Sequence, residues 1–381
     1  MSSNVCDVFI AGAGPVGLAA AIALRLRGAD VLIADALRPP IDKPCGEGLM
    51  PDARQALAEL GVDLEPRDGA RFAGISFISD LYSVAANFPS GVGIGVRRTV
   101  LHSLLLDRAA SLGVRFRWNA PVALHPGQPA TIEGNAVSYQ WMIGADGSSS
   151  RVRAWAGLDS DRVRSRRFGF RAHYRIEPWS DHVEVHWGRL GQAYITPVGR
   201  DEICVSAMTR DAGVRLDQIL ASLPVLGERL AGAKGSSSER GCLTVTRRLR
   251  RVGCRNVALI GDASGSVDAI TGEGLAVGFR EALLLAESLS AGSLARYQAG
   301  HGRILGRPQL MAGALLLLDR HPRLRSRTLQ LFASQPALFR SLLAFHVGES
   351  ALPALMARRL NRHSTAVTDP SSYLSDNPAS D

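Results

Sequence analysis

The chain lacks most of the residue types from which metal sites, disulfide frameworks and lysine-rich surfaces are built. Lys43 and Lys234 are its only lysines, and its cysteines form no CxxC pair or other metal-ligand spacing. The odd number of cysteines and their wide scatter predict free thiols in a reducing compartment. We therefore expect no metal site. The five cysteines are Cys6, Cys45, Cys204, Cys242 and Cys254.

Long apolar segments are also missing. The longest wholly apolar stretch near the C-terminus, Leu310 to Leu318, is about half as long as a membrane span. We expect no signal peptide, because the first predicted strand already begins at Val5. These absences predict a cytoplasmic protein.

The net charge of +9 comes almost entirely from arginine. Arginines gather at 162–167, 247–251 and 320–327, without the interleaved aromatic side chains on which bases stack, so nucleic acid is not an expected partner. A phosphorylated cofactor, an acidic carrier or an anionic membrane surface would each use this charge. Solvated arginine faces are the plainer interpretation for most of these residues.

What the chain does contain is typical of an α/β protein. Its 381 residues allow one large fold or two domains, and the hydrophobic fraction of 46% with 39 glycines fits a compact fold with many turns.

The first 35 residues predict a βαβ unit. A buried strand over 5–11 is followed by a helix over 18–27, and a second buried strand over 31–34 ends on Asp35. Between the first strand and the helix lies the G-x-G-x-x-G segment Gly12-Ala13-Gly14-Pro15-Val16-Gly17.

Each part of this unit stands where dinucleotide binding requires it. Gly12 permits the tight turn, Gly14 lets the backbone approach a pyrophosphate, and Gly17 lets helix and strand pack closely. The helix N-terminus faces the phosphate charge, and Asp35 is placed to hydrogen-bond a ribose diol. A glycine-rich turn in another parallel sheet would leave Asp35 unexplained.

A loop rich in proline and glycine, 38–49, follows the second strand. We expect it to lie against whatever the dinucleotide carries. Cys45 is either a reactive thiol beside that group or a small buried filler. A helix is predicted from Pro51 to Leu60.

The next hundred residues predict short strands and one amphipathic helix. The segment 91–95 breaks the strand pattern because it alternates glycine with apolar residues. The predicted elements are two strands within 72–88, a helix from 97 to 113, and strands at 114–118, 121–124 and 141–145.

A second motif follows the last of these strands. Residues 144–153 match G-A-D-G-x-x-S-x-V-R at every fixed position. We expect Asp146 to accept hydrogen bonds across the turn, Gly147 to bend it, and Ser148 or Ser149 to cap the following helix. The plainer alternative is an ordinary capped junction.

Residues 165–245 alternate with period two, with glycine turns between, and predict an antiparallel sheet with one covered and one available face. A helix is expected over 216–230 and a flexible loop over 232–239.

A third motif resumes the dinucleotide fold. A buried strand over 256–262 ends in Gly261-Asp262, and Thr271-Gly272-Glu273-Gly274-Leu275 opens a helix from 276 to 289. From residue 290 onward the chain is mainly helical, and 365–381 is predicted to be a disordered tail.

The three motifs in this order resemble those of the superfamily of FAD-dependent aromatic hydroxylases (p-hydroxybenzoate hydroxylase-like) and geranylgeranyl reductases. The resemblance spans roughly residues 5–290. It implies that FAD is the cofactor, with its pyrophosphate at Gly12, Gly14 and Gly17 and its adenosine ribose at Asp35. The further implied contacts are Arg98 near the flavin, the Val122 backbone near adenine, Asp146 between the cofactor and nicotinamide sites, and Asp262 on the ribityl and pyrophosphate part. We assign the rest of the cofactor site to Ala13, Pro15, Val16, Cys45, Gly46, Gly272, Glu273, Gly274 and Leu275.

The sequence departs from typical hydroxylases at two motifs. Their usual G-D-A-A-H is here G-D-A-S-G, with Gly265 in place of histidine, and their G-Q-G is Gly272-Glu273-Gly274. The K-P-C-G-E-G segment 43–48 and the T-G-E-G segment 271–274 are more similar to the geranylgeranyl reductase branch. The W-x-W-x-I-P motif of flavin halogenases, which share part of the pattern, is absent.

The resemblance implies an α/β fold with an FAD-binding Rossmann-like domain of the glutathione-reductase type, an inserted antiparallel-sheet substrate domain and a helical C-terminus. We expect the FAD-binding domain to comprise 1–70, 96–160 and 246–295. The substrate domain would comprise 71–95 and 161–245, followed by a C-terminal helical segment at 296–364.

The predicted function is that of a monooxygenase that uses NAD(P)H as a transient electron donor. It would hydroxylate an apolar or aromatic small molecule with molecular oxygen, through a flavin C4a-hydroperoxide. The alternative is a flavin-dependent C=C reductase, for which Cys45 or Tyr194 are weak candidates as proton donor. A carrier-bound substrate and peripheral membrane contact are further options. A binding protein without flavin chemistry, like the related GDP-dissociation inhibitors, would be expected to lose the phosphate-binding glycines, which are intact here.

Overall fold

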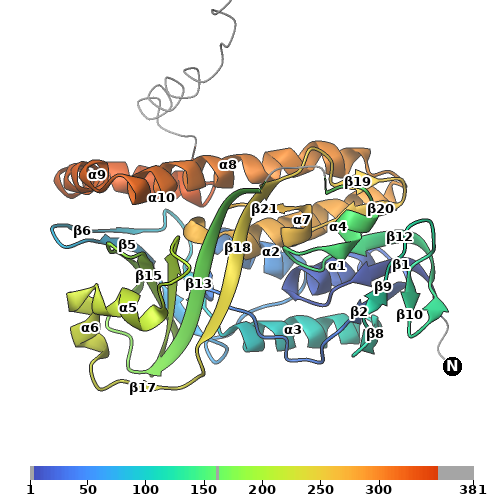
Figure 1. Cartoon of the computed structure of the whole chain (residues 1–381), viewed down its shortest axis with the longest axis horizontal. Helices are drawn as coiled ribbons and strands as arrows, with labels where there is room; N and C mark the ends of the chain where they lie inside the picture. The colour runs from blue at the N-terminus through green and yellow to red at the C-terminus, as the bar shows by residue number, and fades with distance from the viewer. Residues whose placement is uncertain (1–3, 160–162, 351–381) are drawn as a thin grey trace, which may run out of the picture.

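The computed structural model describes residues 4–159 and 163–350 of the chain. Two sheets lie side by side, and a layer of C-terminal helices runs along one side of both (Figure 1). The predicted disordered tail and the last residues of the predicted C-terminal helical segment fall outside the described residues.

The first sheet carries the dinucleotide motif. Its six strands run in the order β19-β20-β12-β1-β2-β8, and β20, β12, β1, β2 and β8 are parallel. The inner strands β1, β2 and β20 are short, mostly apolar runs, as expected for strands that are buried on both faces, whereas the edge strand β8 carries Arg115 and Arg117. The bounds of the strands are β1 Val5–Ala11, β2 Val31–Asp35, β8 Arg115–Trp118, β12 Ser138–Gly144, β19 Gly253–Cys254 and β20 Val257–Leu259.

Four helices pack on one another beside this sheet. The α1 helix contacts both α3 and α7, and α2 contacts α7. The alanine-rich sequence of α1 gives it small side chains, which are buried almost along its whole length and let the neighbouring elements approach closely. The helices are α1 Pro15–Arg25, α2 Pro51–Glu59, α3 Arg98–Ser111, α4 Arg151–Trp155 and α7 Gly274–Ser290.

The second sheet is mixed, so the prediction of a purely antiparallel sheet is wrong in one place. The β14 strand pairs parallel with β5, because the chain returns to this sheet after passing through the first one. The other neighbours are antiparallel. The bounds are β5 Gly74–Ile78, β6 Ser83–Asn87, β13 Val163–Arg175, β14 His182–Trp187, β15 Gln192–Gly199, β16 Glu202–Thr209, β17 Lys234–Gly235, β18 Arg240–Arg248 and β21 Gly265–Ser266.

Both faces of this sheet are covered along the central strand β13, which differs from the expectation of one available face. On β13, Phe168, Phe170 and Ala172 pack into an apolar cluster with α5 and α6. The residues that alternate with them, among them Arg171 and His173, are buried on the other side.

Four further local predictions are corrected. The predicted helix over 216–230 is two helices, α5 Leu216–Ala221 and α6 Pro224–Leu230, because proline lacks the N–H that a continuous helix needs at that position. The segment 91–95 contains strand β7, Gly93–Gly95, and the 38–49 loop ends in strand β3, Gly48–Leu49. The predicted loop over 232–239 contains β17. The remaining short elements are β4 Ala70–Phe72, β9 Val122–Ala123, β10 Thr131–Ile132, β11 Asn135–Ala136, η1 Gly261–Ser264 and η2 Ala269–Thr271.

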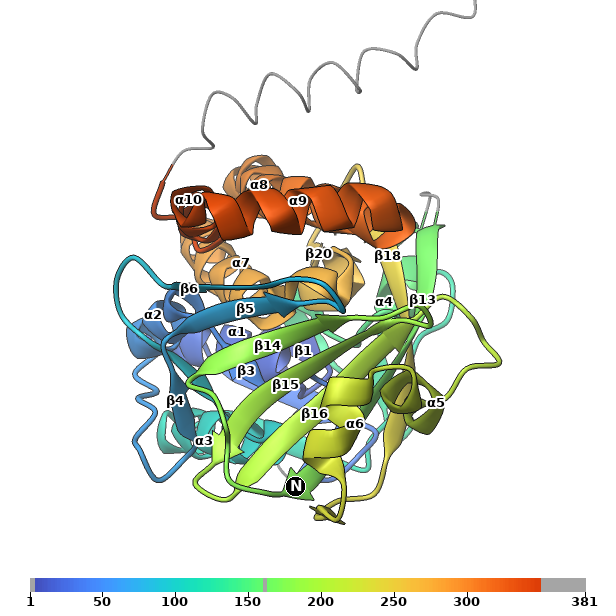
Figure 2. The same cartoon turned by 90° about the vertical axis from the view of Figure 1, so that its left-hand side faces the viewer.

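The C-terminal helices form an outer layer. They are α8 Ala295–Arg320, α9 Pro322–Ser334 and α10 Pro336–His346. Figure 2 shows this layer above α7, the edge strand β6 and its neighbour β5. Buried side chains fill the space between helices and strands, including Phe77, Trp187, Phe332 and Phe339, whose rings pack on one another. The apolar C-terminal residues thus form a packed core. The predicted division of the chain into domains stays a prediction.

Candidate functional site

The three predicted motifs meet at one edge of the first sheet. In the parallel register Ala11 pairs with Gly144, and Gly144 with Leu259. The glycine-rich turn, the Asp-Gly turn and the Gly-Asp turn therefore leave the carboxyl ends of three adjacent strands, where open α/β sheets bind their ligands.

Two glycines of the first turn are required by close packing. Gly12 has a left-handed backbone (φ 107°), and a Cβ there would lie 2.4 Å from the Ala145 carbonyl oxygen. A Cβ at Gly17 would lie 2.0 Å from the Gly12 oxygen. Gly14 differs, because a Cβ there would meet no atom within 4 Å. The space above Gly14 is thus open for a ligand to approach the backbone.

Ala13 is held from both sides. Its N–H donates to the Asp35 carboxylate (2.8 Å), and the Nε2–H of His102 donates to its carbonyl oxygen (2.9 Å). His102 is fully buried, and desolvation lowers its pKa from the ordinary value of 6.5. His102 was not predicted as a site residue; its signal in the sequence is its place one turn into the helix that Arg98 opens.

Asp35 lies at the end of β2 as predicted. Its second carboxylate oxygen accepts from the Leu37 N–H (2.9 Å), and both oxygens keep further lone pairs for a ligand. Val122 begins strand β9, away from the three turns in sequence but packed against the same core.

Asp146 anchors the second turn. Its carboxylate accepts from the Ser150 hydroxyl (2.5 Å) and from the N–H groups of Arg151 (2.7 Å) and Val152 (3.1 Å). The prediction that Asp146 accepts hydrogen bonds across the turn is confirmed. The residue that caps the helix is Ser150, whose Oγ accepts from the Arg153 N–H (2.9 Å). Ser148 and Ser149 were the wrong candidates because the helix begins two residues later than expected.

The buried Arg153 joins the second turn to the third. Its guanidinium donates to the carbonyl oxygens of Ser148 (2.9 Å) and Ala263 (3.2 Å). The third turn is also fixed from α7, where the fully buried Glu281 accepts from the Gly261 N–H (2.6 Å) and lies 3.0 Å from His301.

Asp262 combines access to solvent with a position deep in the protein. Its side chain is exposed, yet desolvation raises the pKa of its carboxyl group, against the opposing pull of Lys43 and Arg98. A carboxyl group that is both accessible and poorly solvated lines a recess of the surface. Asp262 is thus accessible from the surface and lies in the electrostatic range of Lys43 and Arg98.

The Gly272-Glu273-Gly274 segment opens helix α7 without a capping side chain. A Cβ at Gly272 or Gly274 would meet no atom within 4 Å, so the backbone here is accessible, and Leu275 is half-buried. The Glu273 side chain points inward, where Arg307 (3.4 Å) and His346 (3.4 Å) pair with it. The predicted backbone contact is thus available, while the Glu273 carboxylate ties α7 to the C-terminal layer.

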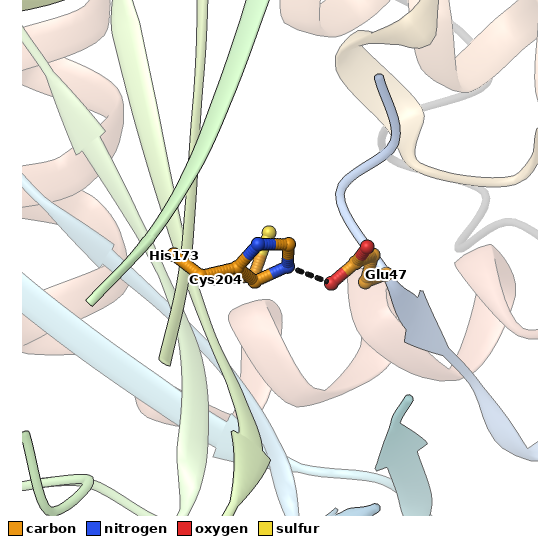
Figure 3. Close-up of side chains that lie close together, drawn as sticks. All are labelled: Glu47, His173 and Cys204. Carbon is orange, nitrogen blue, oxygen red and sulfur yellow. Dashed lines mark hydrogen bonds and ion pairs between the residues drawn. The ribbon is translucent and has the colours of Figure 1, made fainter. Parts of the chain in front are cut away.

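A buried pair joins the Cys45 loop to the second sheet. Glu47 and His173 are both almost fully buried, and Oε2 of Glu47 lies 2.6 Å from Nε2 of His173 (Figure 3). Arg171 and Arg97 donate to the other ring nitrogen, so this nitrogen is an acceptor and Nε2–H donates to Glu47. Glu47 also accepts from the Arg98 N–H (2.9 Å).

Glu47, His173 and Cys204 offer three ligand atoms within 4.8 Å of one another. A metal ion would need the Nε2 lone pair of His173, which carries the proton donated to Glu47. Two guanidinium groups also contact His173, and burial raises the pKa of the Cys204 thiol. The group is therefore better suited to hydrogen bonding than to metal binding. Glu47 and His173 were not predicted as a pair, because 126 residues separate them in the sequence.

The two candidate proton donors are both poorly acidic. Burial raises the pKa of the Cys45 thiol, whose sulfur accepts from the Glu47 N–H (3.4 Å). Burial also raises the pKa of Tyr194, whose hydroxyl donates to the Ile270 carbonyl oxygen (3.3 Å). Cys45 lies beside Arg98 and the exposed Gly46, whereas Tyr194 lies near the start of α7, so the structure does not bring the two donors together.

The residues around the three turns fit a dinucleotide. Helix α1 has Gly14 as its N-cap and no capping side chain, so its first N–H groups are available to a pyrophosphate. The buried Nε of Arg98 has no hydrogen-bond partner among the described residues. The donor set, one helix N-terminus with arginine and backbone N–H groups, suits phosphate and flavin oxygens.

Comparison with known proteins agrees with this geometry. Residues 5–187 match the family model described as FAD binding domain. The menaquinone reductase of Mycobacterium tuberculosis is 30% identical over 318 residues, which cover 76% of this chain and 78% of the relative. The 12-dehydrotetracycline 5-monooxygenase/anhydrotetracycline 6-monooxygenase of Streptomyces rimosus is 31% identical over 167 residues, which cover 40% of this chain and 33% of the relative. The flavin-dependent brominase Bmp2 has a similar fold, with a TM-score of 0.80 at 19% identity over 95% of this chain and 99% of the brominase.

The chain belongs to the superfamily of FAD-dependent aromatic hydroxylases and geranylgeranyl reductases. It is an FAD-dependent oxidoreductase, as the three motifs predicted. None of the helices in the described part of the chain combines the length and the apolar character that a membrane crossing requires.

Proposed function

We propose that the protein is an NAD(P)H-using monooxygenase that hydroxylates an apolar or aromatic small molecule. FAD, when bound, supplies the redox chemistry and the activation of oxygen. The protein's own residues bind and orient FAD, and the second sheet with the C-terminal helices covers the site. NAD(P)H would dock transiently, since the chain has a single dinucleotide-binding βαβ unit.

The cofactor contacts follow from the loops described above. The pyrophosphate would lie on the N–H groups at Gly14 and the start of α1, with the ribose at Asp35. Arg98, Asp146 and Asp262 would contact the remainder of FAD, and the accessible backbone at Gly272 and Gly274 would meet the flavin ring. We assign the first sheet and its helices to a glutathione-reductase-type domain, with the second sheet inserted into it.

The state of Cys45 and Tyr194 is the observation that favours oxygenation. Reduction of an isolated C=C bond needs a proton for the carbon beside the one that receives hydride. An efficient general acid has a pKa near the working pH, whereas burial moves both of these groups away from it. Oxygen transfer to an electron-rich substrate has no such requirement for an acid from the protein, because the transferred oxygen atom comes from O₂, which FAD would activate when bound.

Double-bond reduction is the second candidate, and a specific observation favours it. The match to the menaquinone reductase extends over three quarters of the chain, whereas the match to the tetracycline monooxygenase covers less than half. Cys45 also lies in the segment that is more similar to the reductase branch. Its thiol remains protonated, so it still holds a proton that could be donated.

Product analysis separates the two candidates. The test incubates the FAD-loaded protein with NADPH and candidate aromatic or polyprenylated quinone substrates, under ¹⁸O₂ and under anaerobic conditions. Hydroxylation predicts a product heavier by one ¹⁸O atom that forms only with oxygen. A saturated product that forms without oxygen, and that the Cys45→Ser variant forms much more slowly, would replace the first candidate by the second.

A further inference from the structure

The outer layer of C-terminal helices exposes apolar side chains in an ordered way. Among the described residues ten large hydrophobic side chains are exposed, and four of them lie on the 39 residues of α8 and α9. They are Leu310 (52% exposed), Leu317 (42%), Leu324 (39%) and Leu331 (42%).

Their spacing places these leucines on one side of each helix. Leu310 and Leu317 are seven residues apart on α8, and Leu324 and Leu331 are seven apart on α9. Seven residues are almost two full helical turns, so the members of each pair project in nearly the same direction. Both views show α8 and α9 in the outermost layer of the molecule (Figures 1 and 2).

The outer layer formed by α8, α9 and α10, the last of which contributes Arg340, carries a large excess of positive charge. Residues 295–346 contain eight arginines and a single acidic residue, Asp319. Five of these arginines are exposed and form no ion pair with a described carboxylate. They are Arg303, Arg320, Arg323, Arg327 and Arg340. We call the four leucines together with these five arginines the α8–α9 patch.

We propose that the α8–α9 patch docks the protein on the surface of an anionic lipid bilayer. Leucine side chains on the outer face of the two helices would enter the boundary between headgroups and acyl chains, and the flanking arginines would contact lipid phosphates. The helices would lie in the plane of the surface. This proposal does not rest on the proposed function, because it uses no residue of the flavin site.

The chemistry of the patch favours lipid over a protein partner. Four half-exposed leucines supply much less area than the about 800 Å² per partner that a stable protein interface buries. Unpaired arginines of one sign would repel their copies across a symmetric dimer. A bilayer surface with negative headgroups satisfies the arginines and accepts isolated apolar side chains.

Vesicle co-sedimentation of the full FAD-loaded chain tests the proposal. We expect binding to phosphatidylcholine vesicles that contain about 30% phosphatidylglycerol, little binding to pure phosphatidylcholine, and release at about 0.5 M salt through screening. The double variants Leu317→Gln/Leu324→Gln and Arg323→Gln/Arg327→Gln should each bind at least about tenfold more weakly. Their flavin spectrum and NADPH oxidation should stay unchanged, since none of these residues belongs to the flavin site.

Matched variants elsewhere control for composition. Val225→Gln/Leu243→Gln removes exposed apolar side chains, and Arg189→Gln/Arg200→Gln removes exposed arginines, both outside the patch. Both control variants should bind vesicles like the unchanged protein.

Several outcomes would overturn the proposal. These are no vesicle binding, equal binding to neutral and anionic vesicles, or equal losses in patch and control variants. The proposal would also be overturned if the Arg358→Gln/Arg359→Gln variant, changed beyond the described residues, lost vesicle binding while the patch variants kept it. A change from dimer to monomer on mutating the patch, without vesicle binding, would identify a self-association surface instead.

Discussion

The two large sheets of the protein bury polar groups in different ways. Around the first sheet, charged side chains such as Asp35 and Asp146 bond mostly to backbone within the turns that they fix. On the second sheet, Arg167 and Arg171 are buried in the middle of a strand and pair with Asp268 and Asp42, which lie on distant segments. The first arrangement is local and the second joins separate parts of the chain.

This difference indicates which interactions stabilise the candidate site. A turn that is held by its own carboxylate keeps its geometry with few outside contacts. A buried arginine on a strand requires its acidic partner, because an unpaired buried charge costs several kcal/mol. The Glu47–His173 pair is of the second kind, since it fixes the Cys45 loop from the second sheet.

The largest expected effect concerns the first sheet's tightest turn. Gly12→Ala should lower the free energy of unfolding by about 3–5 kcal/mol, because its Cβ would clash with the Ala145 carbonyl at an unfavourable positive φ. Urea unfolding of the apoprotein measures this loss of unfolding free energy. Gly127→Ala is the control, since Gly127 also has a positive φ (72°) but open space around its Cβ position. Equal losses in both variants would show that backbone strain, and not the close approach, makes Gly12 necessary.

Removal of the carboxylate beneath the third turn comes next. Glu281→Ala would leave the Gly261 N–H without its partner and the buried His301 with only the Ser264 hydroxyl (3.0 Å), and should cost about 3 kcal/mol of unfolding free energy. Glu287→Ala, which removes a half-exposed ion pair with Arg296 on the same helix, should cost at most about 1 kcal/mol. Thermal unfolding monitored by circular dichroism compares the two. Similar losses would contradict the assigned role of Glu281.

Glu47→Gln tests the link between the two sheets. The glutamine amide can still accept from the Arg98 N–H, but the charge beside His173 and Arg171 is lost, so we expect a loss of about 2 kcal/mol. FAD should also bind more weakly, because the Cys45 loop loses its anchor. Glu177→Gln, on the turn between β13 and β14, is the control for removing one carboxylate. An unchanged unfolding midpoint and FAD affinity in Glu47→Gln would show that the pair links nothing.

The smallest expected effect is a pH dependence. Burial lowers the pKa of His102 in the folded protein, so below its ordinary value of 6.5 the unfolded chain binds a proton that the folded protein does not. Stability is therefore lost as the pH falls below about 6.5, with a slope of at most about 1.4 kcal/mol per pH unit from this residue. His102→Gln should flatten this slope between pH 6.5 and 5. Urea unfolding measures the free energy of unfolding at each pH. If this free energy falls equally with pH in the His102→Gln variant and in the unchanged protein, the prediction is wrong.

The sequence predicted the first sheet well because its signals are local. Strand, turn and helix over residues 5–35 follow one another within the motif itself, and Asp146 lies within six residues of every group that it binds. Each of these interactions depends on residue types a few positions apart.

Other interactions could not be predicted, because they join residues that are far apart in the sequence. In the sequence, His173 is one residue of a predicted strand whose residues alternate with period two. Only the fold places it against Glu47. The parallel pairing of β14 with β5 depends on a register between segments about 100 residues apart. The break between α5 and α6 was signalled locally by Pro224, and the expectation of one helix overlooked it.

FAD titration of the Gly14→Ala apoprotein tests most directly the claim that the open space at the first turn holds the cofactor. A Cβ at Gly14 meets no protein atom, so the fold should tolerate it and the unfolding midpoint should not change. The same Cβ would obstruct the pyrophosphate, and flavin fluorescence quenching should show FAD affinity reduced at least about tenfold. Unchanged FAD affinity in this variant would contradict the account.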